Sequence, residues 1–306
     1  MKISVDYGAV ESKKYFGTKI FAQNLKEALI RYDNKNTYIF YDFKNVYPKI
    51  FWNKIGLSIA ELKFQPKIFL ALNQAVPLYV NGKIISFFHG LSFYFYPEFY
   101  SKSEINRLNS QLKEMVKRSD KIVVSSIRVK KELLKLFLNK NIDKKIFVLP
   151  FGVPFDILKN KPKKNKEKIF LFVGGSQPIK NFSFIKNVFK EFQKNHKNYK
   201  LINVTNLNRK QLINYYQKAT ALLTSSFYES FNLPVLEALA LGCPVIATSS
   251  AIIPELKKYV NIAKDEDEFL KLMFEIPKKP NKKIIKEIKE KFSWENYVKK
   301  LIKLYR

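Results

Sequence analysis

The segment from Ala221 to Thr248 constrains the fold most, because it reads as a strand, a loop, a helix and a second strand in immediate succession. It begins with the apolar run ALLT and ends with VIAT. Short runs without alternation of apolar and polar residues are typical of parallel strands covered by helices on both faces. Between the runs, Pro234 suits the first turn of a helix, and Gly242 followed by Pro244 ends it. We therefore expect an α/β fold.

Two glutamates flank the predicted start of this helix. Glu229 lies in the loop and Glu237 lies one turn inside the helix, so that both can face one cavity. The N–H groups near Phe231, Asn232 and Leu233 would form a positive helix terminus, which suits a phosphate or a sugar hydroxyl. Carboxylates beside it would accept hydrogen bonds from sugar or ribose hydroxyls. The plain alternative is a solvated glutamate and an ordinary helical one, but the surrounding strand, turn and closing glycine favour a site.

The sequence ESFNLPVLEA resembles the E-x7-E signature of the retaining glycosyltransferases of family 4. The resemblance implies an α/β chain with the GT-B fold, in which two Rossmann-like domains face each other across a cleft that holds a nucleotide sugar. It implies that Glu229 is the catalytic acid near the donor sugar and that Glu237 holds the ribose. Ser230 and Asn232 stand where the family usually has glycine. Asparagine tolerates a left-handed backbone, so we expect the loop shape to survive at that position.

Two N-terminal segments resemble the same family. FGTKIFAQNL, with a turn at Gly17 before a helix from Thr18 to Arg31, is similar to the family's glycine-rich entry and implies donor binding. HGLSFYFYPEFY follows a predicted strand, and the resemblance makes His89 a catalytic residue, although Gly90 replaces an aspartate. A histidine that merely ends a core strand is the alternative. For the aromatic run from Phe93 we favour loop packing over contact with an acceptor.

A third segment, VGGSQPIKN, follows the predicted strand from Ile169 to Val173 and resembles the family's V-G-x-x-x-P-R-K-N. The resemblance implies that Gly174 and Lys180 bind the donor, with Lys180 also catalytic because its ammonium would stabilise the departing diphosphate. Ile179 stands where arginine is common, so one cation is missing.

Pro and Gly residues around position 152, followed by the charged run KNKPKKNKEK, predict a domain boundary. We expect an N-terminal acceptor-side domain over residues 1–153 and a donor-binding domain over residues 154–306. The resemblance implies that a last helix over about 293–306 crosses back to the first domain. The donor domain is shorter than in the family, with one strand where two are usual.

The composition adds a charge question. The chain has 306 residues with 56 basic and 26 acidic side chains, a net charge of +30, and most of the excess is lysine. The lysines are spread along the chain, so we rank nucleic acid last among the partners. A genome with many A and T bases and an anionic membrane surface remain equal alternatives. One cysteine, Cys243, and no long apolar segment predict a cytoplasmic protein, either free or peripheral at the inner face of a membrane.

The combined interpretation is a retaining hexosyltransferase. It would move a hexose such as mannose from a nucleotide-sugar donor to a glycan or lipid-linked acceptor in cell-surface polysaccharide synthesis, without a cofactor or a metal. The alternatives are a GT-B binding protein that has lost catalysis and, last, a basic nucleic-acid-binding protein.

Overall fold

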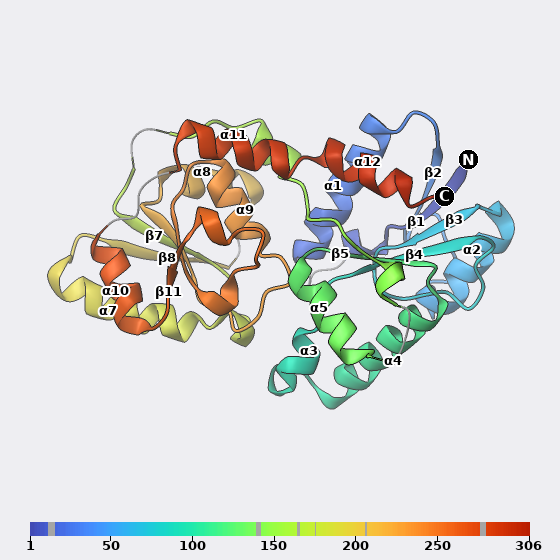
Figure 1. Cartoon of the computed structure of the whole chain (residues 1–306), viewed down its shortest axis with the longest axis horizontal. Coiled ribbons are helices and arrows are strands. Elements are labelled where there is room, and N and C mark those ends of the chain that lie inside the picture. Colours follow the sequence, from blue (N-terminus) through green and yellow to red (C-terminus); the bar gives the residue numbers. More distant parts are fainter. Residues whose placement is uncertain (12–15, 139–141, 164–165, 175, 206, 276–279) are drawn as a thin grey trace. The chain divides into compact units, whose positions relative to one another are not determined.

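The computed structural model describes residues 1–306 apart from 12–15, 139–141, 164–165, 175, 206 and 276–279. The chain divides into two compact units (Figure 1). The N-terminal unit contains Met1–Phe151 and Trp294–Arg306, and the C-terminal unit contains Gly152–Ser293.

The N-terminal unit is built on six parallel strands in the order β2-β1-β3-β4-β5-β6. Its strands are β1 (Lys2–Asp6), β2 (Thr37–Tyr41), β3 (Ile68–Ala71), β4 (Lys83–Phe88), β5 (Lys121–Val124) and β6 (Ile146–Val148). The central strands are buried almost throughout, as continuous apolar runs of a parallel sheet require.

Helices pack on this sheet, and each of them buries at least one apolar side chain. They are α1 (Phe16–Tyr32), α2 (Leu57–Phe64), α3 (Ser92–Phe95), α4 (Lys102–Arg118), α5 (Ile127–Leu136) and α12 (Trp294–Lys303). A π-helical turn (Trp52–Gly56) leads into α2, and short 3-10 turns cover Gly8–Glu11, Pro97–Phe99 and Asp143–Lys145.

The start of helix α1 differs from the sequence prediction. Helix α1 already includes Gly17, which therefore lies in the first helical turn and not in a loop before it. Helix α4 is capped by Ser101, whose hydroxyl accepts from the N–H of Glu104.

The C-terminal unit has five parallel strands in the order β11-β10-β9-β7-β8. They are β7 (Ile169–Val173), β8 (Lys200–Val204), β9 (Ala221–Thr224), β10 (Val245–Thr248) and β11 (Asn261–Ala263). Its helices are α6 (Phe155–Leu158), α7 (Phe182–Asn195), α8 (Arg209–Lys218), α9 (Leu233–Ala240), α10 (Glu266–Phe274) and α11 (Lys282–Lys291), with 3-10 turns at Pro178–Lys180, Ser249–Ala251 and Lys257–Tyr259.

The last helix, α12, packs along α1 in the N-terminal unit (Figure 1). Its Tyr297 ring meets Phe21 edge-on, with 6.1 Å between the ring centroids. The ammonium of Lys121 donates to the carbonyl of Leu304 at 2.7 Å, and the hydroxyls of Tyr38 and Tyr305 lie 3.1 Å apart. These contacts fix the end of the chain on the N-terminal unit.

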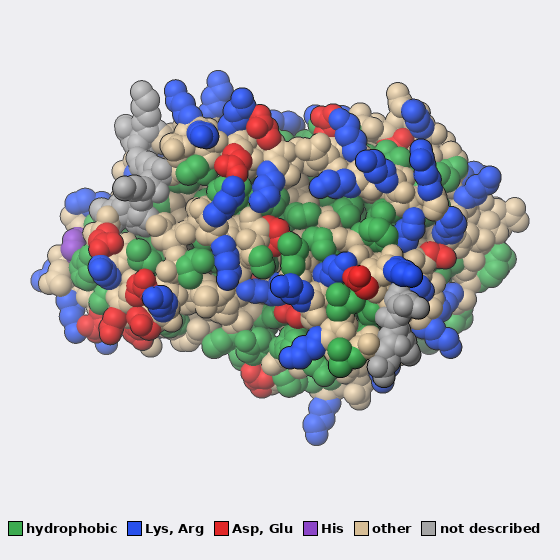
Figure 2. Space-filling model, viewed as in Figure 1, with side chains coloured by type: hydrophobic (Ala, Val, Ile, Leu, Met, Phe, Trp, Pro, Cys, Tyr) green, Lys and Arg blue, Asp and Glu red, His purple; other side chains and the backbone are tan. Residues whose placement is uncertain are grey.

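Lysine and arginine side chains are spread over both units on the visible face, and acidic side chains are few (Figure 2). This dispersion agrees with the distribution of lysines along the sequence. Among the helices of the described residues, none is long and apolar enough to cross a bilayer.

Candidate functional site

The strand order of the C-terminal unit reverses between β7 and β9, since the chain continues from β7 to β8 on one side and from β9 to β10 on the other. In open parallel sheets, ligands bind at the carboxyl ends of the strands beside such a reversal. Lys180 follows β7 and Glu229 follows β9. The fold therefore brings these two predicted site residues to the position where a ligand is expected.

Lys180 and Glu229 form an ion pair, with 2.7 Å between Nζ and Oε1. The Lys180 side chain is 23% exposed and the Glu229 side chain 10%. The hydroxyl of Ser226 donates to the same carboxylate oxygen at 2.7 Å. Lys180 and Ser226 thus both hold Glu229, while the ammonium of Lys180 keeps some access to solvent.

Backbone contacts join the two loops that carry this pair. The Ser225 hydroxyl donates to the carbonyl of Asn181 at 2.9 Å, and the N–H of Phe227 donates to the carbonyl of Ile179 at 3.0 Å. Asn181 adopts a left-handed conformation, with φ 55°, which turns the chain into α7. The loop after β7 and the loop after β9 consequently form one connected structure.

Gly174 allows this arrangement. A Cβ atom at Gly174 would lie 2.8 Å from the ring of Phe172 and 2.9 Å from the Cβ of Lys180. Such separations are shorter than side-chain carbons tolerate, so a larger residue would displace Lys180. The absence of a side chain at Gly174 therefore allows Lys180 to occupy its observed position.

The start of α9 has the predicted form. Asn232 precedes the helix with φ 69°, in the left-handed region that the sequence prediction required, and its side-chain amide donates to the carbonyl of Ala251 at 3.0 Å. Phe231 is buried, while Ser230 and Leu233 are partly exposed. At the other end, Gly242 has φ 69°, and the N–H of Cys243 donates to the carbonyl of Ala238, which closes the helix.

Glu237 has a different cation. Its side chain is 2% exposed, and its Oε1 lies 2.8 Å from Nη1 of Arg209, the first residue of α8. Arg209 also makes a two-pronged contact with Asp156, from Nε at 2.8 Å and from Nη2 at 3.0 Å. The guanidinium therefore bridges a buried carboxylate and a more exposed one.

Burial controls the electrostatics of this group. It raises the pKa of the Glu237 carboxyl, and the nearby Arg209 charge opposes that rise. For Arg209, burial acts to lower the pKa, but the hydrogen bonds to Asp156 and the charge of Glu237 outweigh it and raise the pKa. Arg209 thus stays charged and favours the ionised form of Glu237.

In the N-terminal unit, His89 follows β4. Its Nε2 lies 2.7 Å from the carbonyl of Leu72, and burial lowers the pKa of its imidazole, although that hydrogen bond acts in the opposite direction. A carbonyl only accepts, so the neutral ring donates from Nε2 and leaves Nδ1 with a lone pair. Gly90 has φ 119°, a backbone conformation in which a residue with a side chain would be strained.

The sequence analysis missed a second polar group of this unit. Asp6 ends β1, is fully buried, and accepts from the N–H of Gly8 at 3.1 Å and from Nδ2 of Asn73 at 2.8 Å. The strand order reverses between β1 and β3, so these residues lie at the corresponding position of the N-terminal sheet. Burial raises the pKa of Asp6 to about 6, although the hydrogen bonds act in the opposite direction.

Arg209 was also missed. One signal could have found it: only six of the 56 basic residues are arginines. A guanidinium makes two-pronged contacts with carboxylates that an ammonium cannot make, so a rare arginine in a lysine-rich chain is a candidate for such a contact.

The structure describes no group of three or more His, Cys, Asp and Glu side chains that could hold a metal ion in the ranges it covers. The sequence contains one Asp-x-Asp spacing, Asp265 to Asp267. It starts α10, where the Asp265 carboxylate accepts from the N–H of Glu268 at 2.8 Å. This spacing is therefore a helix cap.

Residues 156–276 match the protein family described as glycosyl transferases group 1. The chain is 29% identical over 217 residues to the O-antigen chain mannosyltransferase RfbU of Salmonella typhimurium, with 62% of this chain and 58% of that protein covered. It is 22% identical over 270 residues to the O-antigen chain mannosyltransferase B of Escherichia coli, with 73% and 70% covered. The chain thus spans less than two thirds of the Salmonella relative.

Solved structures are similar over the whole chain. A sucrose-phosphate synthase from Thermosynechococcus elongatus has a TM-score of 0.69 at 15% identity, with 100% of this chain and 98% of that chain covered. The lipopolysaccharide outer core galactosyltransferase WaaB in its apo form has a TM-score of 0.61 at 14% identity, with 99% of both chains covered. The chain has the GT-B fold. This confirms the predicted pair of Rossmann-like domains.

Proposed function

We propose that this GT-B chain is a retaining hexosyltransferase that uses a nucleotide-sugar donor and a glycan or lipid-linked acceptor in cell-surface polysaccharide synthesis. The observation that carries the proposal is the Lys180–Glu229 pair at the strand reversal of the C-terminal sheet. The names of the two mannosyltransferase relatives favour a mannose-like hexose. We further propose that transfer needs no metal or cofactor, and that the protein works in the cytoplasm at the inner face of a membrane.

Each residue has a proposed role. Negative charge collects on the departing diphosphate, and the Lys180 ammonium would stabilise it by leaving Glu229 for the phosphate oxygens. Glu229, released, would accept a hydrogen bond from the donor sugar. In the N-terminal unit, the Nδ1 lone pair of His89 would accept another. Gly17 and the segment from Ser230 to Leu233 would line the donor phosphates.

Glu237 would bind the ribose, with help that the sequence did not predict. A neutral carboxyl is a weaker acceptor than a carboxylate, and burial favours the neutral form. Arg209 is therefore a positioning residue, because it keeps Glu237 ionised and fixes its orientation. Asp156 in turn fixes Arg209.

A hollow of about 600 Å³ in the N-terminal unit suits the acceptor. Tyr94, Asn106 and Asn109 lie in its lining. An aromatic ring and amide groups are the chemistry that a sugar acceptor needs, since the ring stacks and the amides exchange hydrogen bonds with hydroxyls. In the aromatic run, Phe93 is buried in the core whereas Tyr94 is half exposed.

A catalytically inactive binding protein is the second candidate. It is favoured by the same ion pair, because Lys180 is already bound to Glu229 and the neighbouring Ile179 supplies no second cation. Such a protein would bind the nucleotide but release no sugar from it.

The test is a thermal-shift and hydrolysis screen against UDP-, GDP-, ADP- and dTDP-sugars, with the variant Glu237→Gln and the exposed control Glu191→Gln on α7. We expect one nucleotide to stabilise the wild type and the control but not Glu237→Gln, and the matching donor to be hydrolysed. Stabilisation without hydrolysis or transfer would establish the binding protein. No shift with any donor would contradict both.

A further inference from the structure

The N-terminal unit exposes several large apolar side chains on α2 and on the segments next to it. Six large apolar side chains there are between 40% and 72% exposed. We define the apolar platform as Phe51, Ile55, Ile59, Leu62, Leu78 and Tyr79. Monomeric soluble proteins rarely expose apolar groups together in this way, so the surface calls for a partner.

Helical spacing places four of these residues on one side of the segment 51–64. Ile59 and Leu62 follow Ile55 by four and seven residues, which is the spacing of one helix face, and the N–H of Ile55 donates to the carbonyl of Phe51. The opposite face is buried and contains Leu57 and Ala60. Helix α2 is thus apolar on its outer side as well, where a surface helix is normally polar.

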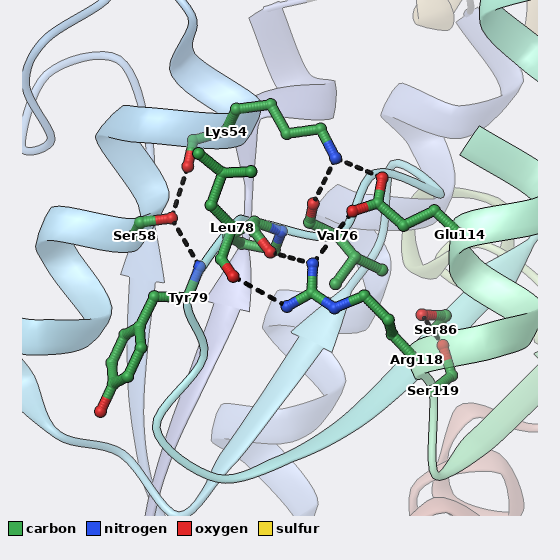
Figure 3. A network of polar contacts seen from close by, with 10 residues as sticks. Lys54, Ser58, Val76, Leu78, Tyr79, Ser86, Glu114, Arg118 and Ser119 are labelled. Atoms are coloured by element: carbon green, nitrogen blue, oxygen red, sulfur yellow. Dashed lines mark hydrogen bonds and ion pairs between the residues drawn. The ribbon is translucent and has the colours of Figure 1, made fainter. Parts of the chain in front are cut away.

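Polar contacts fix the remaining two residues beside α2 (Figure 3). The Ser58 hydroxyl donates to the carbonyl of Lys54 and accepts from the N–H of Tyr79 at 3.0 Å. The N–H of Leu78 donates to the same Lys54 carbonyl at 3.3 Å. Figure 3 shows the Tyr79 ring pointing away from this network.

A second set of contacts holds the same loop from helix α4. Arg118 donates to the carbonyl of Pro77, and to that of Leu78 at 3.1 Å. Glu114 accepts from Arg118 at 3.0 Å and from Lys54, whose ammonium also donates to the carbonyl of Val76 at 3.0 Å. These hydrogen bonds and ion pairs therefore connect the loop that carries Leu78 and Tyr79 to both α2 and α4, although the two side chains themselves are exposed.

Phe51 supports this interpretation. It has φ 52°, in the left-handed region, while its side chain is largely exposed. Bulky residues rarely adopt this conformation because it is strained. Because the ring is not buried within this unit, packing inside the unit does not offset the strain. We therefore expect the compensating contact to lie outside the unit.

The charged residues near the platform in sequence indicate which kind of partner it binds. Residues 42–83 contain six lysines and two acids. Glu61 is fully buried and accepts from Ser4, and Asp42 accepts from the backbone of the following turn. Lys49 and Lys63, next to the platform in sequence, are exposed. An apolar surface with a basic rim complements an anionic bilayer, where apolar side chains enter the acyl boundary and lysines meet headgroups.

We propose that the apolar platform docks this protein on anionic lipid membranes. A second copy of the chain fits less well, because a symmetric dimer would place each basic rim against itself. The inference extends the proposed function, since a lipid-linked acceptor would lie in the same bilayer. It rests on the surface and not on the transfer reaction.

The experiment is vesicle flotation of the full chain without donor, on phosphatidylcholine vesicles with and without phosphatidylglycerol. The double variant Ile59→Asn with Leu62→Asn removes the outer face of α2. Ile30→Asn, at an exposed apolar position of α1, is the matched control. Unfolding followed by the fluorescence of Trp52 and Trp294, both in this unit, checks that each variant is folded.

We expect the wild type and the control to float with the anionic vesicles, and the double variant to lose about tenfold or more in partitioning. Equal flotation of all three proteins would overturn the inference, because binding would then be explained by general electrostatic attraction between lysines and the anionic vesicles. Absence of flotation for the wild type would overturn it too. So would a wild-type dimer in sedimentation that the double variant dissociates, because the platform would then bind protein. Flotation without donor hydrolysis would support this inference and contradict the proposed enzyme function. Donor hydrolysis without flotation would support the enzyme function and contradict this inference.

Discussion

Replacing Arg209 by methionine should be costly because it leaves the buried Glu237 carboxylate without its cation. Glu237 is 2% exposed, and the guanidinium nitrogen lies 2.8 Å from its oxygen. Removing one partner of a buried ion pair costs about 3–5 kcal/mol. Asp156 also loses its partner, but its side chain is 41% exposed, so it adds at most about 1 kcal/mol. We expect Arg209→Met to lose about 3 kcal/mol near neutral pH, which lowers the melting temperature by roughly 6–12 °C.

The pH dependence has a defined sign. Burial already raises the pKa of Glu237, and the rise should be larger without the opposing charge and hydrogen bond of Arg209. A group whose pKa is higher in the folded state stabilises the protein below its unfolded pKa, and this contribution is lost as the pH rises through the folded value. The loss in Arg209→Met should therefore be smaller in mild acid than in mild base.

The assay is urea unfolding followed by far-UV circular dichroism, together with hydrogen exchange of peptides from α9. Fluorescence does not serve here, because both tryptophans belong to the N-terminal unit. Adding Glu237→Gln should restore much of the stability, since a buried amide is cheaper than a buried charge. Arg31→Met, in an exposed pair with Glu27, should cost less than about 1 kcal/mol. If Arg209→Met is as stable as Arg31→Met, or loses the same amount at both pH values, the reasoning is wrong.

Two further predictions concern the N-terminal unit, where tryptophan fluorescence is the readout. Burial raises the pKa of Asp6 to about 6, so its contribution to stability should fall by on the order of 3 kcal/mol as the pH rises from about 4 to above 6. The stability of Asp6→Asn relative to the wild type should rise over that window, and a constant difference would contradict the assignment. Gly90→Ala should cost about 1–3 kcal/mol because φ is 119° there, whereas Gly17→Ala, helical with open space at its Cβ, should gain about 0.5–1 kcal/mol. Equal effects of the two alanines on urea unfolding would refute this contrast.

Local patterns were enough to predict much of the fold. Buried parallel strands such as β4 and β7 are continuous apolar runs, so they are visible without knowledge of their neighbours. The left-handed Asn232 and the closing Gly242 were likewise predictable, because few residue types tolerate that conformation. In contrast, the segment 44–65 could not be assigned from sequence. Its outer face is apolar at Ile55, Ile59 and Leu62, which removes the periodicity that identifies a surface helix.

The site could be predicted only in part, because its contacts join residues far apart in the chain. The motif located Lys180 and Glu229, but not that they would bind each other across 49 positions. It located Glu237 inside a helix, but burial and the contact with Arg209 depend on how α8 and α9 pack. Asp6 and Asn73 meet only because β1 and β3 are neighbours in the sheet.

The central claim is that the strand reversal of the C-terminal sheet binds and activates a nucleotide sugar through Lys180. The most direct measurement is the rate of nucleoside diphosphate release from the donor that the screen identifies, compared between the wild type, Lys180→Met and the exposed control Lys190→Met. We predict that Lys180→Met lowers kcat by about 10²–10³ with a smaller change in KM. The reason is that the negative charge of the departing diphosphate, which Lys180 would stabilise, increases in the transition state. The control should match the wild type. Equal kcat values in all three proteins would contradict the account.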